Sequence, residues 1–180
     1  MVDQNNKKSL RIYLKKIRLS IPIQQRETAS FAACQELYQK IGAVEQILSF
    51  ASIGSEINLW DLNHKLMSEN RLVLPKREGN HLALHLVNKK EQLKKNSWGF
   101  YEPTSDCMPI DANQIGIGLI PGLGFDLHTK HRLGYGKGLY DQFLSTCRIQ
   151  KIWGIGFKEQ SLEEFPYGPL DIPMDEIYLF

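Results

Sequence analysis

Short apolar runs that alternate with helical segments constrain the fold of this chain more than any other feature of its sequence. The runs at 46–52, 71–75, 114–121 and 151–157 are bounded by polar or turn residues, which is typical of strands buried on both faces. Helical spacing of apolar residues predicts helices over 5–18, 22–41, about 58–70 and 138–147. This alternation implies right-handed crossovers. We therefore expect one α/β domain over 1–180, with three α/β/α layers and a mainly parallel, Rossmann-like central sheet.

Three further segments complete the expected architecture. Leucines alternate with less apolar residues over 81–87, which predicts a half-exposed strand, and residues 175–180 are expected to form a last strand. Asn58 followed by Asp61 is typical of a helix cap with an acidic first turn. Residues 88–113 show no periodicity, so the sequence predicts a long loop there.

The composition excludes several functional classes. A hydrophobic content of 42% is enough for a packed core, and a net charge of +2 gives no strong field for nucleic acid or an anionic membrane. No window reaches the roughly 18 consecutive apolar residues of a membrane helix, and the polar N-terminus is not a secretory signal. The three cysteines are widely spaced and form no C-x-x-C pair. We expect a cytoplasmic protein that binds neither nucleic acid nor membranes.

Glycine is concentrated in one segment. Seven of the 14 glycines lie between 116 and 138, where a predicted strand leads toward a helix start. In parallel sheets, ligands bind beyond the carboxyl ends of strands, and the N–H groups of a helix start favour phosphate. The stretch RLGYGKGLYD (132–141) adds the cations Arg132 and Lys137 and the carboxylate Asp141. Cations match phosphate charge, and a carboxylate beside phosphates can hold Mg²⁺.

The common nucleotide motifs are absent from this segment. Lys137 is followed by Gly138, so there is no P-loop, and no glycine pair satisfies G-x-G-x-x-G. There is also no G-x-S-x-G nucleophile motif. The residue types nevertheless favour a nucleotide or phosphate site over a turn that merely lets a helix and a strand pack together.

A basic run near the N-terminus admits two interpretations. On a helix, Lys7, Arg11, Lys15 and Arg18 share one face beside an apolar stripe. That face is either solvated, as charge runs usually are, or its first two cations reach over a bound polyphosphate. The spacing alone favours the solvated face.

The histidines give little support for a transition-metal site. His81 and His85 lie four apart on a predicted strand, which separates them by about 13 Å. His128 and His131 lie in a loop with Asp126 as the one candidate third ligand. We therefore expect no dedicated transition-metal site.

Two isolated residues have open interpretations. Glu56 follows a predicted strand and precedes a helix, so it is either a ligand contact or a first-turn charge. Trp98 is either a stacking wall for a ligand or a residue that fixes the loop around it.

Several segments together resemble one known family. The segments are KKSLR (7–11), SEI (55–57), LPK (74–76), WGFYEP (98–103), PGLGFD (121–126), RLGYGKGLYD (132–141), GFKEQ (156–160) and the MDEI near the end. This combination is similar to the 5-formyltetrahydrofolate cyclo-ligases, also called methenyltetrahydrofolate synthetases. The resemblance implies a monomeric enzyme that uses ATP and Mg²⁺ to convert 5-formyltetrahydrofolate to 5,10-methenyltetrahydrofolate, with release of ADP and phosphate. It also implies phosphorylation of the formyl oxygen, followed by attack of N10.

The resemblance also assigns roles to residues. It implies an ATP site made of Lys7, Lys8, Arg11, Arg132, Leu133, Gly134, Tyr135, Gly136, Lys137, Gly138 and Asp141. Asp141 would help hold Mg²⁺, and Arg132, Lys137 and Tyr140 would carry the catalysis. Glu56, Trp98 and Tyr140 match folate-pocket positions, with Tyr140 where the two ligands meet.

The chain departs from the family pattern in two neighbouring places. The stretch 126–132 is one residue longer than usual and lacks the customary glycine, and Leu139 replaces a frequent tyrosine. We expect these changes to affect the local turn geometry more than the activity. Two rival functions remain: a non-catalytic nucleotide- or RNA-binding relative of the same fold, and a sugar-phosphate isomerase on a similar sheet.

Overall fold

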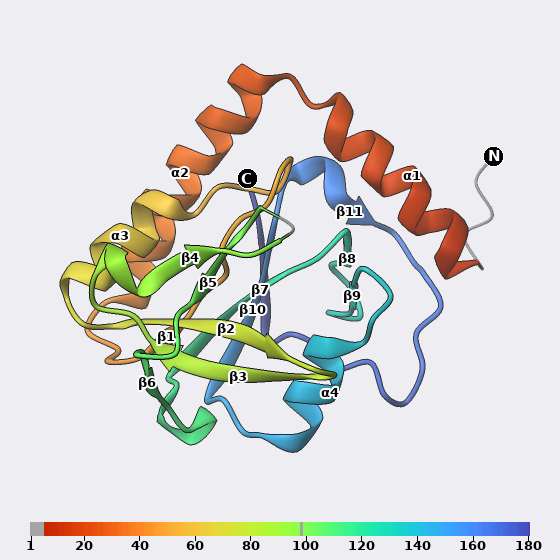
Figure 1. Ribbon diagram of the computed structural model, residues 1–180. Coiled ribbons are helices and arrows are strands. Elements are labelled where there is room, and N and C mark those ends of the chain that lie inside the picture. The colour runs from red at the N-terminus through yellow and green to blue at the C-terminus, as the bar shows by residue number, and fades with distance from the viewer. Residues whose placement is uncertain (1–5, 98) are drawn as a thin grey trace.

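The computed structural model describes residues 6–97 and 99–180, and its centre is a seven-stranded sheet (Figure 1). The strand order is β12-β10-β7-β1-β2-β3-β6. Pairing is parallel from β12 to β2 and antiparallel for β2–β3 and β3–β6. The strands are β1 (Ile47–Leu48), β2 (Leu72–Glu78), β3 (His81–Leu86), β6 (Met108–Pro109), β7 (Ile117–Pro121), β10 (Lys151–Gly156) and β12 (Glu176–Leu179). The predicted mainly parallel sheet is confirmed.

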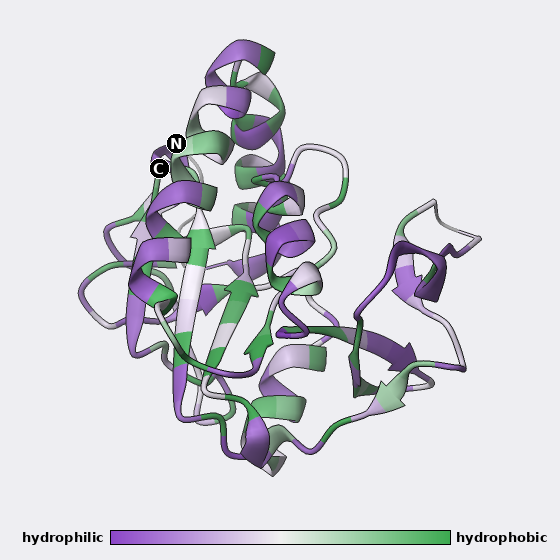
Figure 2. Ribbon diagram, turned by 90° about the vertical axis from the view of Figure 1, so that its left-hand side faces the viewer, coloured by the Kyte–Doolittle hydropathy of each residue, from purple (hydrophilic) through white to green (hydrophobic). Residues whose placement is uncertain are grey.

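Apolar side chains form a separate core on each face of this sheet. Helices α2 (Ile23–Ile41) and α3 (Trp60–Ser68) cover one face, and α4 (Leu139–Thr146) covers the other. Neighbouring residues of β1 show the alternation, because Ile47 packs in the first core and Leu48 in the second. Figure 2 shows these hydrophobic strands among helices of mixed polarity. The three-layer α/β/α arrangement is confirmed.

Helix α1 (Lys7–Ser20) lies outside the main sheet and covers a small second sheet instead. This three-stranded sheet has the order β11-β8-β9. Leu10 and Leu14 of α1 pack against Leu133 of this sheet in a third apolar cluster. A Cβ atom at Gly124 would lie 2.7 Å from Leu14 Cδ1, so the helix can approach this closely only because glycine stands there. The small sheet comprises β8 (Gly124–Asp126), β9 (Arg132–Leu133) and β11 (Ser161–Leu162).

The prediction of a long loop over 88–113 is wrong. This region contains β4 (Leu93–Lys95), β5 (Tyr101–Pro103), β6 and the 3-10 turns η1 (Lys90–Gln92) and η2 (Ala112–Gln114). Strands β4 and β5 pair with each other, and the rings of Tyr101 and Trp60 pack edge to face at 5.4 Å. Strands of two or three residues are too short to show a period of two, which is why the sequence pattern missed them, together with β8, β9 and β11.

Several element boundaries also differ from the predictions. Strand β1 is shorter than 46–52, and α3 begins at Trp60, whose N–H bonds to the Asn58 side chain at 3.0 Å. The expected half-exposure of β3 holds only at its start, since residues 84–86 are all buried. Leu84 and Leu86 are buried because they belong to the core that α4 covers. In the part of the chain that the structure describes, no helix is both long and apolar enough to span a membrane.

Candidate functional site

The glycine-rich turn lies between β9 and α4 and contains two glycines with left-handed backbone. Gly136 has φ 97° and Gly138 has φ 63°, values that residues with a Cβ rarely adopt. The Arg11 guanidinium of α1 lies against this turn and donates a hydrogen bond from Nε to the Gly134 carbonyl at 2.9 Å. A Cβ at Gly136 would lie only 3.3 Å from Arg11 Cζ. The turn therefore requires glycine both for its backbone conformation and for its contact with α1.

Three of the four cations on the basic face of α1, Lys7, Arg11 and Arg18, are buried or half-buried, whereas Lys15 is exposed. Lys7 Nζ lies 2.6 Å from Asp171 Oδ2, and Lys15 Nζ lies 5.9 Å from the centre of the Tyr135 ring. Arg18 is only 7% exposed. The interpretation as a solvated face is therefore wrong for most of this face. Lys8 is exposed, and the contact described for it is a backbone bond to the Asn6 side chain.

A buried ion pair lies where β9 meets α4. Arg132 Nη1 donates to Asp141 Oδ1 at 2.9 Å, and their side chains are 2% and 18% exposed. Burial lowers the pKa of the Arg132 guanidinium, while the charge of Asp141 opposes this shift. Arg132 Nε is buried and has no hydrogen-bond partner among the described residues. The guanidinium thus retains one donor for a further group.

Asp171 belongs to the same region, although no local sequence pattern indicates it. The backbone N–H of the next residue, Ile172, lies 3.4 Å from Asp141 Oδ1. Burial raises the pKa of Asp171, but hydrogen bonds from Lys7 and Gly168 outweigh it and hold the pKa below its ordinary value. Two carboxylates and two cations from distant parts of the chain therefore meet here.

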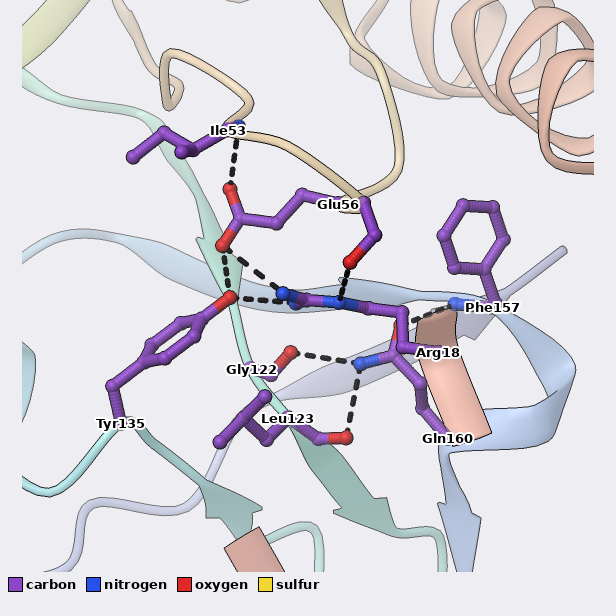
Figure 3. Close-up of polar contacts among 9 residues, drawn as sticks. Arg18, Ile53, Glu56, Gly122, Leu123, Tyr135, Phe157 and Gln160 are labelled. Carbon is purple, nitrogen blue, oxygen red and sulfur yellow. Dashed lines mark hydrogen bonds and ion pairs between the residues drawn. The ribbon is translucent and has the colours of Figure 1, made fainter. Parts of the chain in front are cut away.

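A second polar network joins α1 to the loop after β1 (Figure 3). Arg18 Nη1 donates to the Tyr135 hydroxyl at 2.6 Å and lies 3.7 Å from Glu56 Oε1, while Arg18 Nε donates to Ser55 Oγ at 3.0 Å. The Tyr135 hydroxyl also donates to Glu56 Oε1. Glu56 Oε2 accepts from the Ile53 N–H at 2.9 Å. Glu56 precedes the start of α3 at Trp60, so the interpretation as a first-turn charge is wrong.

Both tyrosines of the glycine-rich segment remain protonated at neutral pH. Although 42% of Tyr135 is exposed, its hydroxyl lies between Arg18 and Glu56, and this local burial raises its pKa well above the ordinary value. Glu56 adds to the shift, while Arg18 opposes it. Burial, followed by the charge of Glu56, likewise raises the pKa of Tyr140. Tyr135 donates its proton to Glu56, and Tyr140 likewise keeps a proton that it can donate in a hydrogen bond.

A cavity of about 520 Å³ borders Glu56 and both of these tyrosines. Apolar residues from the sheet edge, α4 and the β4–β5 region form most of its wall, namely Phe50, Leu82, Phe100, Tyr101, Pro121 and Leu139. Glu56, Tyr135, Lys137 and Tyr140 supply polar atoms to the same wall. An apolar cavity with a few convergent polar groups is the usual form of a small-molecule site. The structure thus brings Glu56 and Tyr140, two of the three residues expected at the folate pocket, next to the glycine-rich turn.

Four of the predicted site residues line this cavity, namely Glu56, Tyr135, Lys137 and Tyr140. Leu133 is 1% exposed and packs in the core beneath α1. Trp98 lies outside the described residues.

Gln160 fixes the exit of β7 below this network (Figure 3). Its amide nitrogen donates to the carbonyls of Gly122 and Leu123 at 2.8 and 3.0 Å, and its oxygen accepts from the Phe157 N–H at 2.9 Å. Gln160 is 1% exposed. This side chain therefore holds the ends of β7 and β10 together under the cavity.

The stretch 126–132 forms a closed turn between β8 and β9. Asp126 Oδ1 accepts from the N–H groups of His128 and Thr129 at 2.8 and 3.0 Å. Lys130 takes the left-handed conformation with φ 64°, in a stretch that lacks the glycine of the family pattern. His131 is buried and stacks on Tyr167, with ring centres 3.7 Å apart. The turn leads into β9, which presents Arg132 to Asp141.

Comparison with known proteins points to one family. The model of the 5-formyltetrahydrofolate cyclo-ligase family matches residues 3–179. A 5-formyltetrahydrofolate cyclo-ligase of Mus musculus is 26% identical over 95% of this chain and 92% of its own length. A probable 5-formyltetrahydrofolate cyclo-ligase of Schizosaccharomyces pombe is 34% identical over 58% of each chain.

Solved structures agree with this assignment. The NMR structure of 5,10-methenyltetrahydrofolate synthetase from Aquifex aeolicus superposes with a TM-score of 0.85 at 27% identity, covering 95% of this chain and 88% of its own. A 5,10-methenyltetrahydrofolate synthetase from Mycoplasma pneumoniae shares the fold, with a TM-score of 0.76 at 22% identity over 96% and 97% of the two chains.

Proposed function

Because the chain belongs to the 5-formyltetrahydrofolate cyclo-ligase family, we propose that it converts 5-formyltetrahydrofolate to 5,10-methenyltetrahydrofolate with ATP and Mg²⁺, releasing ADP and phosphate. The observation that carries the proposal is the meeting of two groups at one cavity. The basic face of α1 and the glycine-rich turn lie beside a wall that contains Glu56 and Tyr140. One side suits phosphates, and the other suits a flat, partly apolar ligand.

The chemistry requires no nucleophile from the protein. The formyl group on N5 is amide-like, so its oxygen is a poor leaving group. Transfer of the γ-phosphoryl group of ATP to this oxygen releases ADP and activates the formyl carbon. N10 then attacks that carbon and loses its proton, and the C–O bond breaks as phosphate leaves. The protein has to hold both substrates in line and neutralise the charge that develops on the phosphate.

The residues of the site fit these tasks. Arg11, Arg132 and Lys137 supply positive charge around the turn, whose glycines allow the backbone to approach phosphates. Arg132 Nε is a buried donor without a partner among the described residues, so a phosphate oxygen would have to enter the turn to reach it. Tyr140 stays protonated and borders the cavity, so it can donate a hydrogen bond where the two substrates meet. Glu56 offers carboxylate oxygens to N–H donors of the folate ring.

The carboxylates beside Arg132 fit a bound Mg²⁺. Mg²⁺ is commonly held by one or two carboxylates together with substrate phosphates. Asp141 and Asp171 would provide these carboxylates, and the ion would supply charge neutralisation for the triphosphate. Among the described residues no group of three His, Cys, Asp or Glu side chains could hold a metal by itself. This agrees with an ion that binds together with ATP.

The proposal is tested by mixing the purified protein with 5-formyltetrahydrofolate and MgATP. We expect the near-ultraviolet absorbance of the methenyl product to appear with ATP and to be absent without it. ATP binding without product would refute the enzyme and favour a non-catalytic nucleotide-binding relative. Isomerisation of a sugar phosphate without ATP would favour the other rival function.

The broader setting of the enzyme is proposed on the same grounds. We propose a cytoplasmic monomer with one cyclo-ligase domain over 1–180 that acts in one-carbon metabolism and binds neither nucleic acid nor membranes. The net charge of +2 and the three dispersed cysteines support this setting. Sedimentation of the purified protein tests the oligomeric state.

A further inference from the structure

Arg18 is the one cation of the α1 basic face that lies deep in the protein. Its side chain is 9% exposed, and the carboxylate of Glu56 beside it is 8% exposed. Buried charges are costly unless other groups satisfy them, so a buried arginine needs partners for its donors. The roles described above for phosphates, metal and folate leave Arg18 unused.

The partners of Arg18 come from two segments that bind different substrates in the proposed function. Ser55 and Glu56 lie in the loop after β1, on the folate side of the cavity, and Tyr135 lies in the glycine-rich turn. Nε and Nη1 of one guanidinium therefore link both segments to α1 (Figure 3). The Arg18 guanidinium also lies 5.6 Å from the centre of the Tyr135 ring.

We propose that Arg18 is a positioning residue of the cyclo-ligase reaction, which holds Glu56 and the Tyr135 hydroxyl in the arrangement that receives the folate ring. This proposal rests on the proposed function. Glu56 Oε2 is fixed by the Ile53 N–H, and Oε1 is fixed by Tyr135 and Arg18. With both oxygens held, the carboxylate presents its remaining lone pairs in one orientation. A group that is already oriented loses less entropy when the substrate binds.

The fork shape of the guanidinium is essential to this role. Arginine presents several donors in a fixed plane, whereas lysine presents a compact charge on a flexible stem. A lysine at position 18 would keep the positive charge beside Glu56 but could not reproduce both the Ser55 and the Tyr135 bonds in the same geometry. Arg18→Lys therefore removes the orientation and retains the charge.

The first test compares Arg18→Lys with the parent enzyme. We expect the KM for 5-formyltetrahydrofolate to rise by about tenfold, the size of effect that loss of one or two well-placed hydrogen bonds produces. The KM for ATP should change by less than about threefold, because Arg11 and Arg132 still surround the glycine-rich turn. An unchanged KM for folate, or an equal rise for ATP, would overturn the proposal. Lys16→Gln, an exposed change on the same helix, is the matched control and should leave both values unchanged.

The second test examines whether Arg18 acts through Tyr135. Tyr135→Phe removes only the hydroxyl of a residue that is 42% exposed, so the variant should fold. It should raise the KM for folate by less than Arg18→Lys does, and the double variant should match Arg18→Lys within about twofold, since both changes remove the same contact. Multiplicative effects in the double variant would show that the two side chains act separately, which would refute the role assigned here.

A direct binding measurement separates this proposal from the proposed function and from a merely structural role. Binding of 5-formyltetrahydrofolate without ATP, followed by intrinsic fluorescence, should weaken in Arg18→Lys by the same factor as the KM rises. If the parent protein binds folate but forms no product with MgATP, the proposed function fails while the positioning test still stands. A variant with a lowered melting temperature but unchanged folate affinity would reduce Arg18 to a structural role.

Discussion

Replacement of Arg132 by methionine should separate charge from packing at the buried end of the site. Methionine keeps a long apolar side chain beside the Tyr140 ring, which lies 5.6 Å from the Arg132 guanidinium. It removes the ion pair with Asp141 at 2.9 Å and the unpaired Nε donor. The proposed function then loses the cation that is best placed to neutralise the transferred phosphate.

The structure sets the size of both expected effects. Removing one partner of a buried ion pair costs about 3–5 kcal/mol, and we expect about 3 kcal/mol here because Asp141 is 18% exposed and can be partly hydrated. For a chain of 180 residues this lowers the melting temperature by about 6–12 °C. Loss of a preorganised group at a developing charge typically lowers kcat by about two to three orders of magnitude.

The assay follows methenyl product at 20 °C, where Arg132→Met should still be folded, and a thermal melt of each variant is recorded in parallel. Arg148→Met is the matched control, since Arg148 is exposed on the segment after α4. It should leave turnover unchanged and alter stability by less than about 0.5 kcal/mol. A folded Arg132→Met variant that retains more than about a third of parental turnover would refute the role of Arg132 in charge neutralisation.

Three other changes test neighbouring features. Gly136→Ala forces a Cβ onto a backbone with φ 97°, so we expect a raised KM for ATP and a loss of about 1–2 kcal/mol in stability. The control is Gly79→Ala, at φ 60° in the β2–β3 turn, which should lower stability without changing the KM for ATP. Asp141→Asn should raise the Mg²⁺ concentration needed for half-maximal rate, and an unchanged Mg²⁺ titration would exclude a metal role. Burial raises the pKa of Asp171, but hydrogen bonds, foremost that from Lys7, outweigh it and hold the pKa below its ordinary value. The ionised carboxylate therefore stabilises the folded protein fully above the unfolded-state pKa of 3.8. This contribution is lost as the pH falls through the lower folded-state pKa. The stability difference between the parent protein and Asp171→Asn, measured by urea unfolding, should therefore be constant near neutral pH and shrink below pH 3.8; a constant difference into strong acid would contradict this.

The long elements could be predicted from the sequence because each carries its own pattern. The apolar runs at β7 and β10 indicated strands covered on both faces, and the spacing in α2 indicated a helix that ends at Gly42. The short strands could not be predicted in this way. Strand β9 has two residues, and its place is set by pairing with Gly124 and Phe125 and by the contact of Leu133 with α1.

The site was only partly predictable for a related reason. The glycines, Arg132 and Asp141 are close in sequence, so their chemistry was visible together. Asp171 gave no local signal, because its importance depends on contact with Lys7, which is 164 residues away. Arg18, in contrast, carries a local signal in the sequence. It continues the four-residue spacing of Leu10 and Leu14, the buried positions of α1, and so falls on the buried side of the helix.

The position of α1 also has a consequence for how long the site persists. The helix is attached to the body through the apolar cluster of Leu10 and Leu14 and through contacts with residues more than a hundred positions later in the chain. If α1 detaches by local unfolding, the cations beside the turn and the guanidinium beside Glu56 leave together. Both substrates would then lose their pockets in a single opening event, and a bound substrate in turn would slow amide hydrogen exchange along the whole helix. A polypeptide still being synthesised also has no complete site until its last third has folded against its first helix.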